Sequence, residues 1–112
     1  MVDRLFRVGH GRQADFEAVF APDGIWAELI ASGTGYLGLA VKSESKVERQ
    51  YRVLDFWKSH ADFERFRESR AADIEKFNLL LANEGLVEKQ ELAGTYYEAD
   101  DGDESGLVSA QS

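Results

Sequence analysis

The stretch Tyr51–Phe66, YRVLDFWKSHADFERF, combines the features that decide the fold. Its first half is rich in β-branched and aromatic side chains, which favour a pleated strand over Arg49–Trp57. Alternation divides this strand into two faces. One face carries Tyr51, Val53, Asp55 and Trp57, and the other carries Arg52, Leu54 and Phe56. Because neither face is simply polar, we expect both to be covered at least in part.

The residues after Trp57 predict a helix that begins at Ser59. The Ser59 hydroxyl can accept a hydrogen bond from an amide of the first turn, and Asp62 favours the positive end of the helix dipole. Apolar residues then recur at helical spacing as one stripe: Phe63, Phe66, Ile74, Phe77 and Leu81. The charged residues lie mainly off this stripe. We predict a long helix that ends near Asn83–Gly85.

The rest of the chain supplies three more strands and a broken helical region. The predicted strands are Asp3–Val8, Gly35–Lys42 and Glu88–Tyr97. A short helix over Arg12–Phe20 is interrupted at Pro22, which has no amide proton and restricts the residue before it. The apolar pattern resumes at Ile25 and stops at Ser32-Gly33.

This order, β-α-β-β-α-β, predicts an α+β fold of the ferredoxin-like type, with a four-stranded antiparallel sheet and helices on one face. The helices cover only one side of the sheet. We assign Tyr36, Val53, Trp57 and Tyr96 to the other side. An apolar sheet face of this size that stayed exposed to water would promote association. A second copy would cover that face across a two-fold axis, so we predict a homodimer whose sheets face each other as a dimeric α+β barrel.

Composition restricts the class of protein. At 112 residues, 44% hydrophobic and 30% charged, the chain is expected to form one globular domain. The absence of cysteine excludes disulfides and cysteine-bound metals. No apolar run is long enough to span a bilayer and no basic leader is apparent, so we expect a cytoplasmic protein that does not enter membranes.

The net charge of −8 is concentrated at one end. Five acidic residues follow Tyr97: Glu98, Asp100, Asp101, Asp103 and Glu104. The rest of the chain has thirteen basic and sixteen acidic side chains, which is close to neutral. We predict a folded domain over residues 1–97 and an acidic disordered tail over 98–112. No basic stripe is present, which argues against nucleic acid and anionic membranes as partners.

The chain resembles the antibiotic biosynthesis monooxygenase (ABM) family of the dimeric α+β barrel superfamily over residues 3–97. The matching features are Val8-x-x-Gly11-Arg12-x-x-x-Phe16, Asp23-Gly24-x-Trp26, Gly35-Tyr36-Leu37-Gly38, Tyr51-x-x-x-Asp55-x-Trp57-x-Ser59, Phe63-x-x-Phe66 and Glu91-x-x-Gly94. The resemblance implies a small-molecule site. Some members of the family are cofactor-independent oxygenases of aromatic polyketides, and others degrade haem.

The resemblance disfavours haem degradation. The haem-degrading members use an Asn in the first strand, a Trp at the end of the third strand and a His in the second helix. Trp57 fits the Trp position, but Asp3–Val8 contains no Asn. The second helix has His60 at its start and only Arg67 or Arg70 where a haem ligand would be expected.

Asp55 is the main candidate for chemistry, because we place it on the barrel interior, where a carboxylate would be partly desolvated. It could act as a general base that takes a phenolic or enolic proton, making the substrate reactive toward dioxygen. The alternative is a structural carboxylate that pairs with an Arg or bonds to a Tyr.

Aromatic side chains would shape the binding site. Trp57 offers a stacking surface for a planar ligand, or packs in the core or the dimer interface. Tyr51 and Tyr96 could donate phenolic protons to a ligand, although Tyr96 also suits an interface. Val53 would lie beside them, and Trp26 would be a core residue or a wall at the mouth of the pocket.

The two histidines, His10 and His60, fall at predicted boundaries. His60 is a second candidate acid or base at neutral pH, and the alternative is a surface residue. Neither histidine has a carboxylate at ligand spacing, so we predict no metal site.

Three functions remain open from the sequence. The first is a monooxygenase that needs no cofactor and acts on a planar aromatic or polyketide-like molecule in the barrel interior. The second is a non-catalytic dimer of the same fold that binds a small ligand. The third, which is weaker, is a haem-binding protein.

Overall fold

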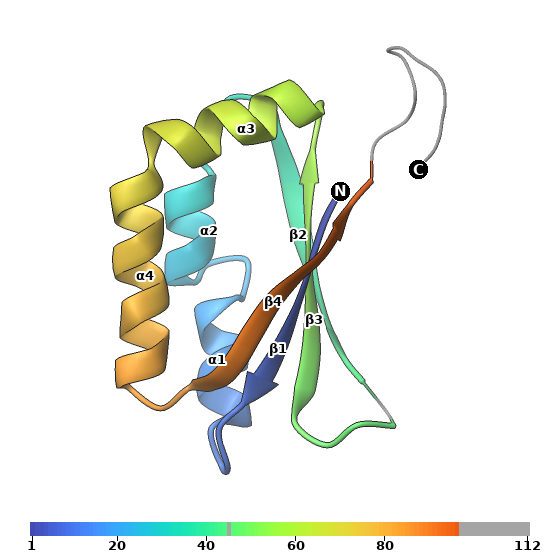
Figure 1. The fold of residues 1–112 in the computed structure, drawn as a ribbon, viewed down its shortest axis with the longest axis vertical. Coiled ribbons are helices and arrows are strands. Elements are labelled where there is room, and N and C mark those ends of the chain that lie inside the picture. The colour runs from blue at the N-terminus through green and yellow to red at the C-terminus, as the bar shows by residue number, and fades with distance from the viewer. Residues whose placement is uncertain (45, 97–112) are drawn as a thin grey trace.

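A four-stranded antiparallel sheet with helices on one face forms the framework of the protein in a computed structural model that describes residues 1–44 and 46–96 (Figure 1). The elements in order are β1 (Val2–Val8), α1 (Gln13–Val19), α2 (Ile25–Ile30), β2 (Tyr36–Ser43), β3 (Gln50–Trp57), α3 (His60–Ser69), α4 (Ala71–Asn83) and β4 (Val87–Thr95). The acidic segment that we predict as a tail, 98–112, lies outside the described residues.

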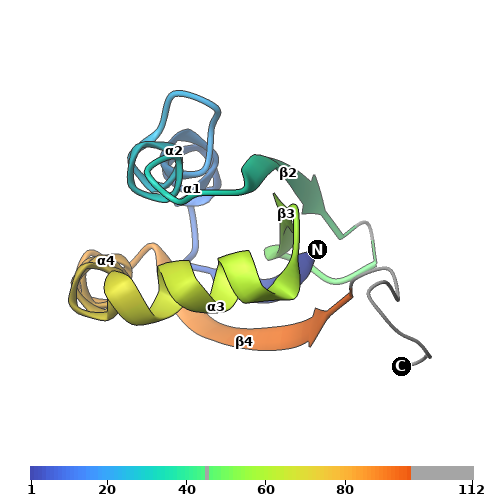
Figure 2. The same cartoon turned by 90° about the horizontal axis from the view of Figure 1, so that it is seen from above.

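The strands are arranged in the order β2-β3-β1-β4, and each neighbouring pair is antiparallel. The two central strands, β1 and β3, are therefore far apart in sequence but adjacent in space. Figure 2 shows that the α1–α2 unit and the α3–α4 unit lie on the same side of this sheet. The predicted ferredoxin-like fold is confirmed, and the predicted strand positions agree with those observed to within about two residues.

The interruption around Pro22 is also confirmed. After α1 ends at Val19, the amide of Gly24 donates to the carbonyl oxygen of Ala21 at 2.9 Å, and α2 begins at Ile25. A Cβ atom on Gly24 would lie only 2.4 Å from the carbonyl oxygens of Ala18 and Val19. The tight turn between the two short helices therefore requires glycine at this position.

The prediction of one long second helix is wrong, because the helix breaks at Arg70 into α3 and α4. The predicted cap at its start is present, since Ser59 Oγ accepts from the amide of Asp62 at 3.1 Å. At the break, Ser69 Oγ donates to the carbonyl oxygen of Phe66 at 3.2 Å, which competes with the helical ladder. Arg70 is held outside helical geometry while its guanidinium donates to Ser32 of the α2–β2 connection at 3.0 Å.

The assignment of sheet faces from the sequence is wrong for Tyr36, Val53 and Trp57. These residues face the helices rather than the opposite side. Val53 is 0% and Trp57 4% exposed, and the Trp57 ring lies 5.2 Å from the ring of Phe66 in α3. Tyr36 is paired with Trp57 across β2 and β3. Tyr96 follows β4 and is 57% exposed.

Strand pairing explains this reversal. The strand register places Tyr51 opposite Phe6, whose ring packs against Phe16 and Phe20 from the first helical region. Residues on this face therefore join one core between sheet and helices. The open face instead carries Leu5, Ala40, Leu54 and Phe56, together with charged side chains such as the Arg52–Asp3 pair.

Candidate ligand-binding site

A buried ion pair crosses the two central strands on the helix-facing side. Asp55 is paired with Val2 across β1 and β3, so Arg4 reaches it diagonally from two residues along β1. Arg4 Nη2 donates to Asp55 Oδ2 at 2.8 Å, and Trp26 Nε1 of α2 donates to Oδ1 at 3.1 Å. Asp55 is only 2% exposed. Each carboxylate oxygen of Asp55 thus accepts one hydrogen bond, from Arg4 of strand β1 and from Trp26 of helix α2.

Aromatic rings surround the Arg4 guanidinium. Its central carbon lies 4.6 Å from the centre of the Trp26 ring, 5.4 Å from Phe6 and 5.9 Å from Phe20. Rings at these distances attract a cation electrostatically. Arg4 Nε is buried and has no hydrogen-bond partner within the described residues. The positive charge is therefore stabilised by one carboxylate and by ring faces, and the buried Nε donor has no partner within the described residues.

A cavity of about 260 Å³ adjoins this pair, between the sheet and helices α2, α3 and α4. Its apolar lining residues are Val2, Trp26, Ile30, Phe63, Phe66, Ile74 and Leu92. Its polar lining residues are Arg4, Asp55, Arg67, Asn78, Gln90 and Glu91. A mainly apolar pocket with a few convergent polar groups is typical of small-molecule sites.

Polar side chains from α3, α4 and β4 lie on the outer side of the cavity. Gln90 Nε2 of β4 donates to Asn78 Oδ1 of α4 at 3.4 Å. Arg67 of α3 donates to Glu64 and lies 6.0 Å from the centre of the Phe63 ring. The Glu64 carboxylate raises the pKa of Arg67, so this guanidinium stays charged. Any ligand in the cavity would therefore lie near two arginines, one buried and one at the surface.

The structure brings two of the predicted site residues together, Asp55 and Trp26. Trp57 packs next to the cavity, against Phe63 and Phe66, but does not line it. Val53 is fully buried and lies opposite Arg4 in the strand register. Because Asp55 faces the helices, the placement of this site in a chamber between two sheets is wrong.

The other three predicted residues lie elsewhere. Tyr51 OH donates to Glu17 Oε2 at 2.7 Å, and this hydrogen bond, together with burial and the Glu17 charge, raises the pKa of Tyr51 to about 12. His60 begins α3, with Nε2 3.4 Å from Glu64 Oε2 and a side chain that is half exposed. The expectation that neither histidine has a carboxylate at ligand spacing is therefore wrong for His60. Tyr96 lies beyond the end of β4. None of the three lines the Asp55 cavity.

Arg4 is the site residue that the sequence analysis missed. It alternates with Val2, Phe6 and Val8, so it is a charged residue on an otherwise apolar strand face. That pattern could have indicated a buried charge, but the identity of its partner depends on the pairing of β1 with β3. The observed Arg4–Asp55 pair matches the structural alternative proposed for Asp55.

The cavity does not offer a ligand for haem iron. Its described lining residues include no His, Cys, Met or Tyr, the side chains that hold haem iron in proteins. Within residues 1–44 and 46–96, no three His, Cys, Asp or Glu side chains are grouped so as to hold a metal ion. None of the helices in the same residues is long and apolar enough to cross a membrane.

Comparison with solved structures identifies the fold. The chain superposes on SnoaB, a cofactor-independent oxygenase from Streptomyces nogalater, with a TM-score of 0.56 and 23% identity over 87% of this chain and 91% of that one. A point variant of SnoaB gives a TM-score of 0.59 at 22% identity, over 87% and 92% of the two chains. The chain therefore shares the fold of SnoaB.

A second neighbour is PA3566 from Pseudomonas aeruginosa, with a TM-score of 0.55 and 15% identity over 88% of this chain and 92% of that one. No family model and no curated protein matches the sequence. The fold expected from the ABM resemblance is thus confirmed by structure.

Proposed function

We propose that the Asp55 cavity binds a compact planar aromatic molecule and that the protein oxidises it with dioxygen, as a monooxygenase that needs no cofactor. The observation that carries this proposal is a buried acid–base pair, Arg4–Asp55, at the wall of an aromatic cavity. The fold, shared with the cofactor-independent oxygenase SnoaB, supports the same class of reaction. Trp26, Phe63 and Phe66 would provide the ring faces against which the ligand stacks.

The chemistry requires a substrate that supplies all the electrons. Asp55 would take a proton from an activated CH₂ group or a phenol, and Arg4 would stabilise the negative oxygen that forms on the substrate. The electron-rich ring would then reduce dioxygen and form a carbon–oxygen bond. Loss of water completes the reaction, in which CH₂ and O₂ become C=O and H₂O. No external reductant is consumed.

Oxygen uptake with anthrone as the probe tests this proposal. We expect turnover in the presence of a metal chelator and without flavin, and its loss in Asp55→Asn. His60→Gln is the matched comparison, because His60 is the other sequence candidate and lies outside the cavity. If His60→Gln abolishes uptake while Asp55→Asn retains it, the proposed role of Asp55 is wrong.

A non-catalytic ligand-binding protein is the second candidate, and one observation favours it. Both Asp55 oxygens already accept a hydrogen bond, one from Arg4 and one from Trp26. Asp55 can therefore act as a base only if a substrate displaces one of these donors or shares an oxygen with it. Quenching of tryptophan fluorescence by a panel of aromatic ligands, with no oxygen uptake for any of them, would favour this function.

We also propose a homodimer that forms through the open face of the sheet. Leu5, Ala40, Leu54 and Phe56 form the apolar part of this face, and Phe56 is 37% exposed. An isologous contact between two such faces would bury the exposed part of this surface, chiefly Phe56, since Leu54 is already only 8% exposed. Light scattering at micromolar concentration should give twice the chain mass, and Phe56→Glu should give a folded monomer. A wild-type monomer would contradict the proposal.

A further inference from the structure

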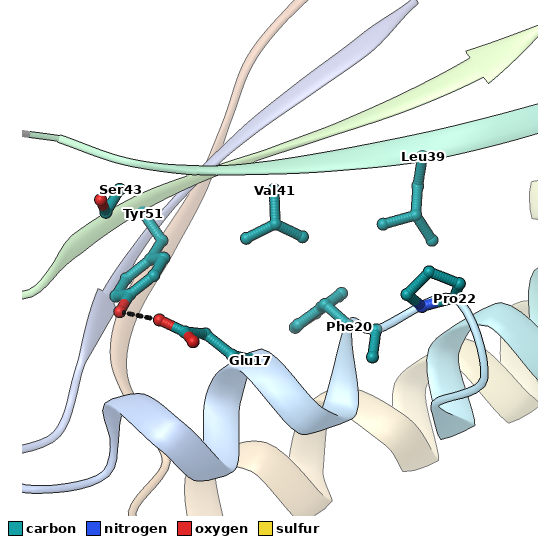
Figure 3. A pocket seen from close by; sticks show the side chains of 8 residues that line it. Glu17, Phe20, Pro22, Leu39, Val41, Ser43 and Tyr51 are labelled. Atoms are coloured by element: carbon teal, nitrogen blue, oxygen red, sulfur yellow. Dashed lines mark hydrogen bonds between the residues drawn. The ribbon is translucent and has the colours of Figure 1, made fainter.

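A second cavity is lined by Phe20 and by residues of β2, and Figure 3 shows its walls. Its volume is about 480 Å³, and it shares no lining residue with the Asp55 cavity. One wall consists of Leu39 and Val41 of the edge strand β2. The opposite wall is formed by Phe20 and Pro22 at the end of α1 and the turn that follows.

The apolar walls remain open because the helices cover β2 incompletely. Leu39 and Val41 are paired with Asp55 and Val53, so they point to the helix-facing side of the sheet. Yet both are only half-buried, whereas Val53 in the neighbouring strand is fully buried. Apolar side chains that line an open cavity of this size remain in contact with water. A ligand that covers them removes this apolar surface from water, which favours binding.

One carboxylate gives this cavity its charge. Glu17 accepts the Tyr51 hydroxyl proton on Oε2 at 2.7 Å, and no other hydrogen bond or ion pair engages its side chain within the described residues. No basic side chain lines the cavity. The phenol of Tyr51 is protonated at neutral pH, so it donates to Glu17 and adds no second negative charge to the cavity.

We propose that this cavity is a second ligand site, which binds a small organic cation with an apolar body. The ammonium group would pair with the second carboxylate oxygen of Glu17 and lie near the ring of Tyr51, whose quadrupole attracts a cation. The apolar body would cover Leu39, Val41 and Pro22. An anionic ligand would instead meet an uncompensated carboxylate, so the two cavities of this chain differ in the charge that they accept.

Calorimetric titration with phenethylammonium, in about 0.15 M salt to screen general attraction to an acidic protein, tests this proposal. Phenethyl alcohol is the matched neutral probe. We expect the ammonium to bind at least about tenfold more tightly than the alcohol, and Glu17→Gln to remove about that advantage, as loss of one charge-assisted hydrogen bond predicts. Methyl resonances of Leu39 and Val41 should shift on binding, and those of Ile74 and Leu92 should not.

Glu28→Gln is the control, because Glu28 is an exposed glutamate on the neighbouring helix that does not line the cavity. It should leave binding unchanged. The proposal is overturned if the alcohol binds as tightly as the ammonium, if Glu17→Gln and Glu28→Gln weaken binding equally, or if the shifts appear at Ile74 instead. A cooperative melting transition in each variant would confirm that it remains folded, and Glu17→Gln should melt at a lower temperature than Glu28→Gln because it weakens the bond to Tyr51.

Discussion

Arg4 and Asp55 form a diagonal pair across β1 and β3, with Arg4 Nη2 2.8 Å from Asp55 Oδ2 and side chains that are 14% and 3% exposed. The pair lies within the apolar layer between the sheet and the helices. In such a layer, an ion pair that keeps both partners contributes little net stability, whereas a single remaining charge is costly.

Removal of one partner should therefore destabilise the protein strongly. We expect Asp55→Asn and Arg4→Met each to lower the free energy of unfolding by about 3 kcal/mol. The double variant Arg4→Met/Asp55→Leu should lose much less than the sum, since it leaves no buried charge. Urea unfolding measures all three values. Additive losses in the double variant would show that the two side chains act independently.

The two tryptophans allow a matched comparison, because each is 4% exposed but only Trp26 has a partner for its indole N–H. Trp57 Nε1 is buried without a hydrogen-bond partner in the described part of the chain. Both Phe variants lose similar ring area, but Trp26→Phe also removes a donor to a carboxylate. We expect Trp26→Phe to cost about 2 kcal/mol more in unfolding free energy than Trp57→Phe. Equal costs would contradict a bond between Trp26 and Asp55.

Tyr36 and Tyr51 should both titrate at unusually high pH, for different reasons. Burial and then the Asp55 charge raise the pKa of Tyr36 to about 12, whereas the bond to Glu17 is the largest cause for Tyr51. Ultraviolet absorbance of phenolate should show both groups near pH 12. Glu17→Gln should lower the pKa of Tyr51 toward 10 and leave Tyr36 unchanged.

The sign of the linked stability follows from the same shift. Since the folded-state pKa of Tyr51 lies above its ordinary value of 10.0, the Tyr51–Glu17 bond stabilises the fold fully below about pH 10. Its contribution is lost as the pH rises from about 10 to about 12. Unfolding of wild type and Tyr51→Phe, measured across this range, should converge at the alkaline end. A constant difference would indicate that Tyr51 stabilises the fold through packing alone.

Gly33 touches the core so closely that an added methyl group would not fit. A Cβ atom there would lie 2.6 Å from Trp57 Cη2 and 2.8 Å from Phe66 Cδ1, both on ring systems that cannot move locally. We expect Gly33→Ala to cost about 2 kcal/mol and to change the near-ultraviolet circular dichroism of Trp57.

Gly11→Ala is the comparison for Gly33→Ala. Gly11 has φ of +72° with open space around it, so an alanine there meets backbone strain alone. It should cost about 1 kcal/mol and leave the tryptophan spectrum unchanged. Similar spectra for both variants would mean that Gly33 does not hold Trp57 in place.

The sequence predicts the order of elements well, because local rules decide them. Alternation in Arg49–Trp57, the break at Pro22 and the cap at Ser59 each depend on a few neighbouring residues, and all are confirmed. The side of the sheet that the helices cover is a different matter. Both faces of β3 carry apolar residues, so the pattern does not decide which face the helices cover. The face with Asp55 is not recognisable as the core-facing one until Arg4 is known to pair with this carboxylate.

The site could be predicted only in part for the same reason. Asp55 and Trp26 are recognisable as polar or aromatic residues in apolar surroundings, but their contact spans two elements. Arg4 becomes the partner of Asp55 only through the register of β1 with β3. At the helix break, the local bond from Ser69 to Phe66 is accompanied by a bond from Arg70 to Ser32, 38 residues away. No pattern within the second helix itself reveals that bond.

The break at Arg70 determines where a ligand can sit. A single straight helix over the residues of α3 and α4 would pack along the sheet in one direction, and its side chains would fill the space between helix and sheet. Two shorter helices that meet at an angle leave space between them and the sheet. The Asp55 cavity lies in this space, lined by Phe63 and Phe66 of α3 and by Ile74 and Asn78 of α4. The volume of the pocket thus depends on the angle between α3 and α4, so a substitution at Ser32 or Arg70 that changed this angle would change the volume while the lining residues stayed the same.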